Sequence, residues 1–219
     1  MSDAASVEQG PPAPGGSEPG PGTVLAGKYR LSRRLGDGAM GVVFLGVHER
    51  LGREVAVKIL RPELSSLSDA VARFQREAEL VTRIGHPSIV TVYDYGRAPD
   101  GSVYYVMERL SGRPLRTRLQ EGPLTDDEVV DVFAPLLSAV HSAHAVSAVH
   151  RDLKPENVMI VPSEAAGGAP EGRPQIKLLD FGVAKIGQAT GGADPNGAGD
   201  GLQTRAGVLM GTPAYMAPE

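Results

Sequence analysis

Residues 150–157 read His-Arg-Asp-Leu-Lys-Pro-Glu-Asn and form the most informative run in this sequence. Basic groups, a carboxylate and an amide stand together there, and the apolar run 158–161 follows directly. A second apolar run, 176–179, leads into Asp180-Phe181-Gly182. Two short strands bounded by Asn157 and Asp180 can place both oxygen ligands beside one hard cation. A charge-rich run is otherwise a solvated connector, and the downstream Asp-Phe-Gly argues against that alternative.

A glycine-rich segment precedes these motifs. Residues 36–41, Gly-Asp-Gly-Ala-Met-Gly, match G-x-G-x-x-G, which alone is weak because a glycine-rich turn also fits. A dinucleotide-binding fold requires a helix directly after the third glycine. Here the β-branched run 42–47 follows, so the motif lies across a β-hairpin. Backbone N–H groups that no side chain blocks suit a lid over phosphates.

A lysine and a glutamate form the third signal. Lys58 ends the run Val55-Ala56-Val57, and Glu77 follows on a predicted helix near its apolar face. A buried ammonium requires a compensating charge, and a lysine paired in this way can hold phosphate oxygens. The alternative is that Lys58 lies at a solvated strand edge and Glu77 on the surface.

The remaining pattern separates strands from helices. Strands are predicted from alternating and β-branched runs at 29–31, 42–47, 54–60, 89–95 and 103–107. Helices are predicted at 69–84 with Ser68 as N-cap, at 114–120, and at 125–146, where Thr125 and Glu128 fit a capping box. The buried stripe of the long helix is expected to hold Val129, Val132, Phe133, Leu136, Leu137 and Val140. Segregated strands and helices indicate an α+β protein with two lobes.

Composition excludes several classes. The chain of 219 residues has 22 Lys+Arg against 26 Asp+Glu and no Cys, so dedicated nucleic-acid binders and disulfide-based or cysteine-zinc sites are disfavoured. No apolar run approaches the ~20 residues of a membrane helix. Glycine and proline are concentrated in three places, which predicts a disordered leader at 1–27 and flexible insertions at 162–174 and 187–201.

Taken together, the motifs resemble those of a bacterial eukaryotic-type (Hanks-type) serine/threonine protein kinase. The shared pieces are G-D-G-A-M-G-V-V, V-A-V-K, H-R-D-L-K-P-E-N, D-F-G and A-P-E, in the family's order. The resemblance covers residues 29–219 and implies a two-lobed kinase fold with a five-stranded antiparallel sheet and one helix in the first lobe. It divides residues 28–219 into an N-lobe (28–108), a hinge (108–112) and a mainly helical C-lobe (113–219). The stop after Ala-Pro-Glu is expected to leave that C-lobe incomplete.

The resemblance also implies residue roles. For ATP it assigns the glycine loop to the phosphates, Lys58 to the α/β-phosphates with Glu77 as its partner, and an apolar and hinge lining to the adenine. The implied nucleotide residues are Leu35, Gly36, Gly38, Gly41, Val43, Ala56, Lys58, Glu77, Met107, Glu108, Leu110 and Met159. A stacked apolar spine between the lobes is expected from Val81, Val92, His150 and Phe181.

For the chemistry, Asp152 resembles the catalytic base, Lys154 the group that steadies the γ-phosphate, and Asn157 and Asp180 the Mg²⁺ ligands, with Mn²⁺ as an alternative metal. Lys154, together with Thr212 before Pro213, is typical of serine/threonine kinases. Arg151 beside the base implies control by a phosphate on the following loop. Regulatory roles are therefore expected for Arg151, Thr204 and Thr212.

The implied activity is ATP-dependent phosphorylation of protein serines and threonines, including autophosphorylation, in the cytoplasm. A catalytically inactive ATP-binding pseudokinase or scaffold is the alternative, and the full set Lys58, Glu77, Asp152, Asn157 and Asp180 argues against it. Protein substrates are the expected partners, without nucleic acid. A dimer of kinase domains and a membrane anchor beyond Glu219 stay open.

Overall fold

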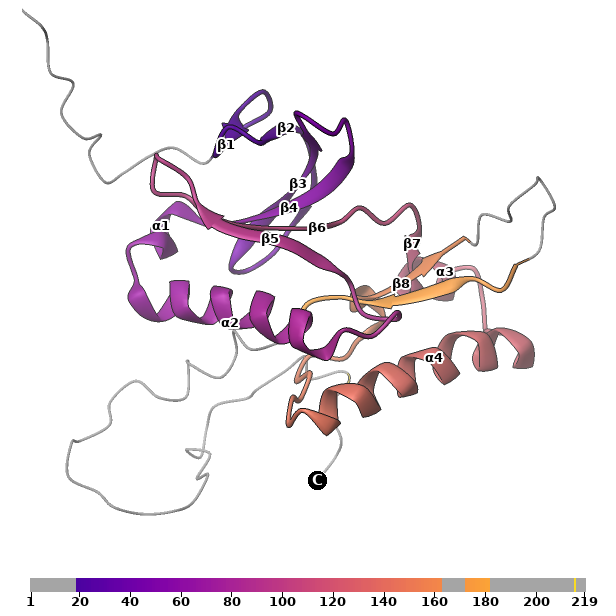
Figure 1. The fold of residues 1–219 in the computed structure, drawn as a ribbon. Coiled ribbons are helices and arrows are strands. Elements are labelled where there is room, and N and C mark those ends of the chain that lie inside the picture. The colour runs from indigo at the N-terminus through magenta and orange to yellow at the C-terminus, as the bar shows by residue number, and fades with distance from the viewer. Residues whose placement is uncertain (1–18, 163–171, 182–214, 216–219) are drawn as a thin grey trace, which may run out of the picture.

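The computed structural model describes residues 19–162, 172–181 and 215. The N-terminal lobe is built on an antiparallel sheet in the order β1-β2-β3-β4-β6-β5 (Figure 1). The predicted meander is confirmed, because β2 pairs with β3 and β3 with β4. Its strands are β1 (Val24–Leu25), β2 (Tyr29–Asp37), β3 (Gly41–His48), β4 (Glu54–Leu60), β5 (Val92–Arg97) and β6 (Val103–Glu108).

This sheet has one strand more than the sequence predicts. In β1, Leu25 pairs with Tyr29 of β2, and the two side chains are only 1% and 5% exposed. The expectation of a disordered leader through residue 27 is therefore wrong for the β1 segment, because burial of Leu25 fixes it against the sheet. Residues 1–18 of that leader lie outside the described part of the chain.

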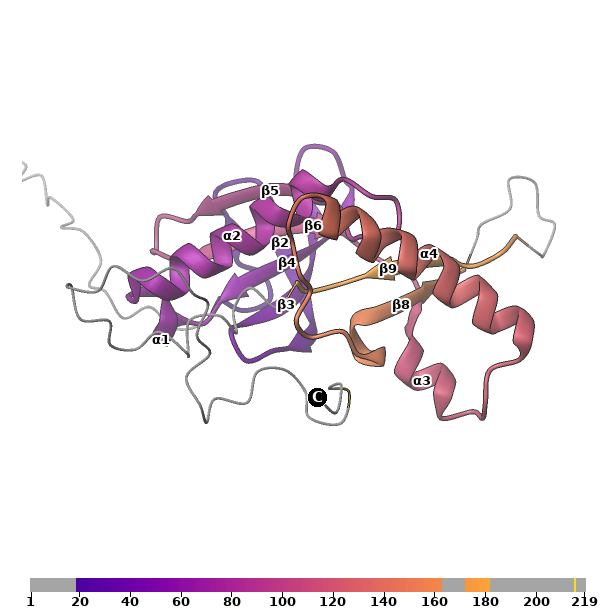
Figure 2. The same ribbon diagram turned by 90° about the horizontal axis from the view of Figure 1, so that it is seen from below.

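One long helix covers a face of this sheet beside β5 (Figures 1 and 2). The predicted apolar face is confirmed, with Phe74 and Val81 buried. Leu67 rather than Ser68 is the N-cap, and it makes no side-chain capping bond. The helices of this lobe are α1 (Pro62–Ser65), which was not predicted, and α2 (Ser68–Ile84).

The second lobe combines a small sheet with helices. Strands β7, β8 and β9 pair antiparallel in that order, and α4 packs against β9 (Figure 2). The predicted capping box at the start of α4 is present, since Thr125 Oγ1 accepts from Glu128 N and the Glu128 side chain accepts from Thr125 N. The elements are β7 (Arg113–Pro114), α3 (Leu115–Leu119), α4 (Asp126–Ala145), the 3-10 turn η1 (Pro155–Asn157), β8 (Val158–Val161) and β9 (Gln175–Leu178).

Only part of the predicted stripe on α4 is buried. Val132 and Leu136 are 3% and 4% exposed and face the core, and Val140 packs against its edge. Val129, Phe133 and Leu137, expected to be buried, are 41%, 41% and 65% exposed. The expectation is wrong for these three, because β9 and the neighbouring core cover only one side of the helix within the described residues.

The lobes are joined through a short parallel contact. The strand predicted at 89–95 begins only at Val92, and Ile89 instead forms an isolated parallel bridge with Leu178 of β9. Val90 N donates to Leu178 O at 3.0 Å, and Leu178 N donates to Ser88 O at 2.8 Å. Ile89 is pulled out of the N-lobe sheet because the core between the lobes buries its side chain to 2% exposure.

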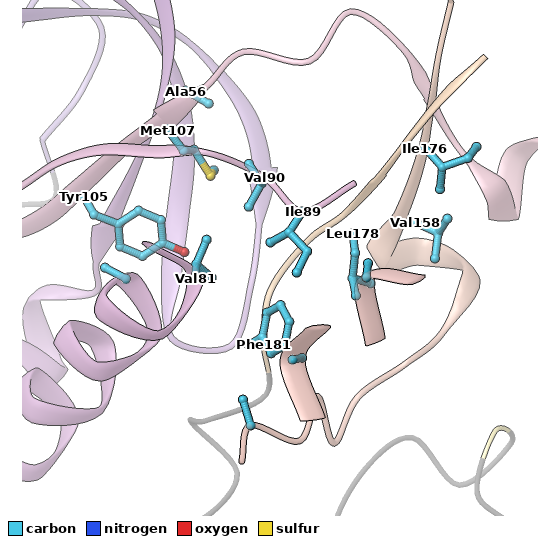
Figure 3. Close-up of a cluster of buried hydrophobic side chains, with 14 of the residues drawn as sticks. Ala56, Val81, Ile89, Val90, Tyr105, Met107, Val158, Ile176, Leu178 and Phe181 are labelled. Atoms are coloured by element: carbon cyan, nitrogen blue, oxygen red, sulfur yellow. The ribbon is translucent and has the colours of Figure 1, made fainter. Parts of the chain in front are cut away.

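Side chains from both lobes meet in one apolar cluster at this contact (Figure 3). Tyr105 and Met107 extend from β6, Val81 from α2, Leu178 from β9, and Phe181 from the segment after β9. Burial of a large apolar side chain contributes roughly 1.5–3 kcal/mol. The cluster therefore fixes the position of one lobe against the other and shapes the space between them.

Candidate active site

A pocket of about 630 Å³ lies between the lobes. Strands β2 to β4 line it from above, the segment after β6 lines its back edge, and β8 lines it from below. Of the residues predicted for the nucleotide, those lining the pocket are Leu35, Gly36, Val43, Ala56, Met107, Glu108, Leu110 and Met159. Asp180 also lines this cavity. The other residues predicted for the phosphates and the chemistry do not line it: Lys58, Glu77, Asp152, Lys154 and Asn157.

Gly38 and Gly41 lie at the turn between β2 and β3 and do not line this pocket. Gly38 N donates to Gly41 O at 2.9 Å, which closes the turn. A Cβ atom at Gly41 would lie 2.4 Å from the carbonyl oxygen of Ile59 on β4. Glycine is required at position 41 because the hairpin packs directly on the neighbouring backbone.

Lys58 and Glu77 form a buried ion pair at the back of the site. Lys58 Nζ donates to Glu77 Oε1 at 2.7 Å and to Asp180 Oδ1 at 2.8 Å. The side chains of Lys58 and Glu77 are 9% and 5% exposed, whereas Asp180 is 49% exposed. The alternative of a solvated strand-edge lysine is wrong. The ammonium connects α2 to the segment after β9.

The charges at this cluster set the protonation states. Burial opposes the charge on Lys58, but Asp180 and Glu77 outweigh it, so the pKa of the ammonium is raised well above its ordinary value. Burial raises the pKa of Glu77, against the effect of Lys58. Partial burial opposes ionisation of Asp180 too, yet the charge of Lys58 lowers its pKa. Lys58 and Asp180 are therefore held in their charged forms.

Tyr105 belongs to this cluster and was missed from the sequence. Its hydroxyl donates to Glu77 Oε1 at 2.9 Å, and the side chain is buried. Tyr105 lies opposite Lys58 in the pairing of β4 with β6. Alternation along the strand places Tyr105 on the same face as Met107, two residues later. Because Met107 was predicted to line the site, this alternation could have identified Tyr105 from the sequence.

The segment 150–157 holds Asp152 by several bonds. Lys154 Nζ lies 3.0 Å from Asp152 Oδ2, and Asn157 Nδ2 donates to Asp152 O at 2.8 Å. Asp152 N donates to His150 Nδ1 at 3.3 Å. The three residues predicted to be catalytic, Asp152, Lys154 and Asn157, are thus brought together.

His150 connects this segment to the strand before Asp180. Its Nε2 donates to Leu179 O at 2.8 Å, and its ring lies 4.8 Å from that of Phe181 between centroids. Burial lowers the pKa of His150. A neutral ring with the proton on Nε2 satisfies both bonds, since Nδ1 then accepts from Asp152 N. The predicted spine contact between His150 and Phe181 is present.

Asn157 and Asp180 come from adjacent strand ends. Leu179 N donates to Asn157 O at 2.8 Å, so the residue preceding Asp180 is tied to Asn157 by its backbone. An amide oxygen and a carboxylate are suitable donors for Mg²⁺, which usually takes one or two protein ligands besides phosphates and water. Within the described ranges, no group of three His, Cys, Asp or Glu side chains forms a metal cage. The donor set fits a metal that arrives with a phosphate ligand.

Two of the four described non-glycine residues with positive φ are predicted site residues. Arg151 has φ 62° and Asp180 has φ 44°, both in the left-handed region that non-glycine residues rarely occupy. Such conformations cost of order 1–3 kcal/mol and cluster at functional sites. The side chain of Arg151 is exposed beside Asp152. Thr204 and Thr212, the other predicted regulatory residues, lie outside the described part of the chain.

Comparison with known proteins decides the family. The protein kinase domain family matches residues 29–219. This chain belongs to the protein kinase family. The resemblance to the bacterial serine/threonine branch is confirmed as well, because the similar curated proteins carry that name.

Two relatives illustrate the match. Serine/threonine-protein kinase pkn3 of Myxococcus xanthus is 42% identical over 199 residues, which are 90% of this chain and 34% of that protein. Serine/threonine-protein kinase PknA of Mycobacterium tuberculosis is 38% identical over 203 residues, 90% of this chain and 42% of that protein. This kinase chain therefore spans about a third to two fifths of the length of these relatives.

Solved structures agree with the fold. The PknI kinase domain of Mycobacterium tuberculosis superimposes with a TM-score of 0.60 at 30% identity, covering 76% of this chain and 64% of that domain. The predicted two-lobed α+β kinase fold is thereby confirmed.

One further ion pair of this kinase domain was not predicted. Lys177 Nζ on β9 donates to Glu108 Oε1 at 2.6 Å, with side chains 6% and 18% exposed. Glu108 Oε1 also accepts from Thr91 N at 2.7 Å. The end of β6 is thus anchored to the strand that leads into Asp180. No local sequence pattern predicts an ion pair between residues that are 69 positions apart.

Proposed function

We propose that the protein is an ATP-dependent serine/threonine protein kinase that transfers the γ-phosphoryl group to hydroxyls of protein substrates and of itself. The observation that carries the proposal is the shared ammonium of Lys58, which joins Glu77 on α2 to Asp180 at the edge of the pocket. In phosphoryl transfer, the protein catalyses the reaction mainly by positioning the reactants and stabilising charge. A charged cluster fixed by burial beside a nucleotide-sized cavity meets both demands.

ATP is assigned to the pocket between the lobes. Val43 and Ala56 would contact the adenine from above and Met159 from below, while the backbone at Glu108 and Leu110 would bond its edge. Leu35 and Met107 complete the apolar lining. The volume of about 630 Å³ lies in the usual range for small-molecule sites. The phosphates would then extend toward Lys58 under the hairpin that carries Gly36, Gly38 and Gly41.

Mg²⁺ is the proposed metal, held by Asn157 and Asp180, and Mn²⁺ suits the same ligands. The metal supplies neutralisation of phosphate charge when it is bound. The support in this chain is the donor set and the backbone bond between Asn157 and Leu179. The charged state of Asp180, favoured by Lys58, keeps its carboxylate ready for a cation.

Asp152 is the proposed base for the acceptor hydroxyl. Three neighbours hold it: Lys154 at its carboxylate, and His150 and Asn157 at its backbone. A positioned base contributes about 10²–10⁴-fold to such a reaction. Lys154, close enough to contact the carboxylate, would also steady the γ-phosphate. Lysine at this position supports serine and threonine as acceptors.

Regulation by phosphorylation is proposed through Arg151. Arg151 lies between His150 and Asp152, its side chain is exposed, and its backbone has a positive φ. A guanidinium there can bind a phosphate on Thr204 or Thr212 and so hold the segment that carries them. The proposed phosphorylation site is Thr204.

The place of action is proposed to be the cytoplasm, where ATP is available. Among the described helices, none is long and apolar enough to span a bilayer.

Two measurements on the full-length protein test the function. ATP binding should require Mg²⁺, and incubation with γ-labelled ATP and a protein acceptor should give phosphoserine and phosphothreonine on acid hydrolysis. Label recovered only on tyrosine would contradict the acceptor class. Binding of ATP with no transfer to any protein would instead support the scaffold alternative.

A further inference from the structure

An ion pair at the tip of the glycine-rich hairpin is not among the residues that the proposed function uses. Asp37 is the last residue of β2, and Arg61 directly follows β4. Arg61 Nη2 donates to Asp37 Oδ1 and, at 3.1 Å, to Gly38 O. Arg61 Nε also donates to Gly38 O at 3.3 Å. One guanidinium therefore holds both the side chain of Asp37 and the backbone of the adjacent glycine.

The backbone of Arg61 adds to this attachment. Arg61 N donates to Met40 O at 3.0 Å, on the far side of the same turn. Through its backbone and side chain together, Arg61 bonds to three of the six residues 36–41. The hairpin tip is thus tied to the end of β4, the strand that carries Lys58.

The charges at this tip are also unusual for a phosphate lid. Asp37 puts a carboxylate within the loop that is proposed to cover the triphosphate. An unpaired carboxylate there would repel phosphate oxygens. Arg61 on one oxygen and Arg34 Nη2 at 2.7 Å on the other offset that charge.

We propose that Arg61 is a positioning residue for ATP, acting as a latch that holds the glycine-rich hairpin over the phosphates and offsets the charge of Asp37. The inference rests on the proposed ATP site. Arg61 bonds to the hairpin and not to the adenine lining. The latch therefore acts on the phosphate part of the nucleotide and leaves adenosine recognition alone.

The test compares nucleotides with and without phosphates. In the full-length protein, Arg61→Met should weaken ATP·Mg binding by about three- to tenfold, the range of one typical hydrogen bond. Adenosine affinity should stay unchanged, which also verifies that the variant folds. Arg61→Lys should recover part of the loss, and Arg50→Met, at the turn between β3 and β4, is the matched control for lost charge.

Asp37→Asn gives an internal check. If the two residues act together, Arg61→Met should cost less in the Asp37→Asn background than in the unaltered protein. Equal losses for ATP and adenosine would show a merely structural role and overturn the proposal, as would an unchanged ATP affinity. Absence of ATP binding in the unaltered protein would remove the proposed function itself, and the latch with it.

Discussion

Lys58 and Asp180 are hydrogen-bonded at 2.8 Å although 122 residues separate them in the sequence. The lysine proposed for the phosphates and the carboxylate proposed for the metal therefore satisfy one another before nucleotide arrives. Glu77 completes the network at 2.7 Å from the same ammonium. On the proposed function, bound ATP and its metal would take over the contacts that Lys58 and Asp180 now make with each other. The site is consequently preorganised in charge and position.

Loss of Lys58 should abolish catalysis while sparing the fold. Lys58→Met removes the only cation bonded to Glu77 among the described residues, and Glu77, whose pKa is already raised by burial, can then take up a proton. We expect autophosphorylation to fall by about 10²-fold or more, in line with the loss of a transition-state charge partner. Labelled ATP and a thermal melt measure the two effects. Undiminished labelling would remove Lys58 from its role.

Asp152 and Asp180 should separate turnover from binding. Asp152→Asn is expected to lower turnover by about 10²–10⁴-fold with little change in ATP affinity, because the carboxylate acts on the acceptor. Asp180→Asn should weaken Mg²⁺-dependent ATP binding. A nucleotide titration at several Mg²⁺ concentrations distinguishes them. Identical behaviour of the two variants would contradict this division of roles.

Lys177 should support both stability and ATP binding. Lys177→Met leaves the carboxylate of Glu108, 18% exposed, without its ammonium, at a cost of about 1–3 kcal/mol. The pocket lining at Glu108 should loosen and ATP affinity should fall. The double variant with Glu108→Gln should lose less than the sum of the single changes.

Lys28→Met is the control for that experiment. Its ion pair with Asp94, at 3.5 Å, has side chains 55% and 29% exposed, so its loss should cost under about 1 kcal/mol. Chemical denaturation of the full-length variants measures both costs. A loss for Lys177→Met no larger than that for Lys28→Met would argue against the anchoring role.

Acid should weaken the connection between α3 and α4. The Arg118 guanidinium and the Thr125 N–H lower the pKa of Glu128 from 4.5 to about 2. Because the folded pKa is depressed, the unfolded state binds more protons below 4.5, and the stability that Glu128 contributes is lost as pH falls from there toward 2.

The corresponding measurement uses denaturation midpoints. The denaturation midpoint of Glu128→Gln should lie below that of the unaltered protein. This difference in midpoint should be largest at about pH 6 and should shrink as the pH falls below 4.5. Glu63→Gln, an exposed change on α1, serves as the control. A difference that stays constant with pH would show that Glu128 does not stabilise the fold through its charge.

Thr204 should be the main autophosphorylation site. Phosphopeptide mapping of active protein is expected to find Thr204 labelled, and Thr204→Ala should reduce both the label and the activity. Thr190→Ala, in the glycine-rich insertion of the same segment, is the matched control and should change neither. Label confined to Thr190 or to residues 1–27 would contradict the assignment.

The sequence predicts those features that depend on local chemistry. The start of α4 follows from Thr125 and Glu128, because a capping box is formed by residues three apart. The pairing of Lys58 with Glu77 stays open on local pattern alone, and it follows from the family resemblance, which assigns Glu77 as the partner of Lys58. The pocket lining followed from the family resemblance, which assigns roles position by position.

Features that depend on distant partners were missed. Periodicity predicts which residues share the apolar face of a helix, but it does not predict which part of that face another element covers. The exposure of Val129, Phe133 and Leu137 could therefore not be predicted. The bridge from Ile89 to Leu178 and the pair of Lys177 with Glu108 join residues from different lobes. Their partners become neighbours only when the lobes pack, so no local signal announces them.

The most direct test of the central claim is phosphate transfer by the full-length protein. With γ-labelled ATP, Mg²⁺ and a protein acceptor, the unaltered protein should place label on serine and threonine. Asp152→Asn, at ATP concentrations that saturate both proteins, should place none above background. Equal labelling by the two proteins would contradict the account, because the transfer would then not depend on the site between the lobes.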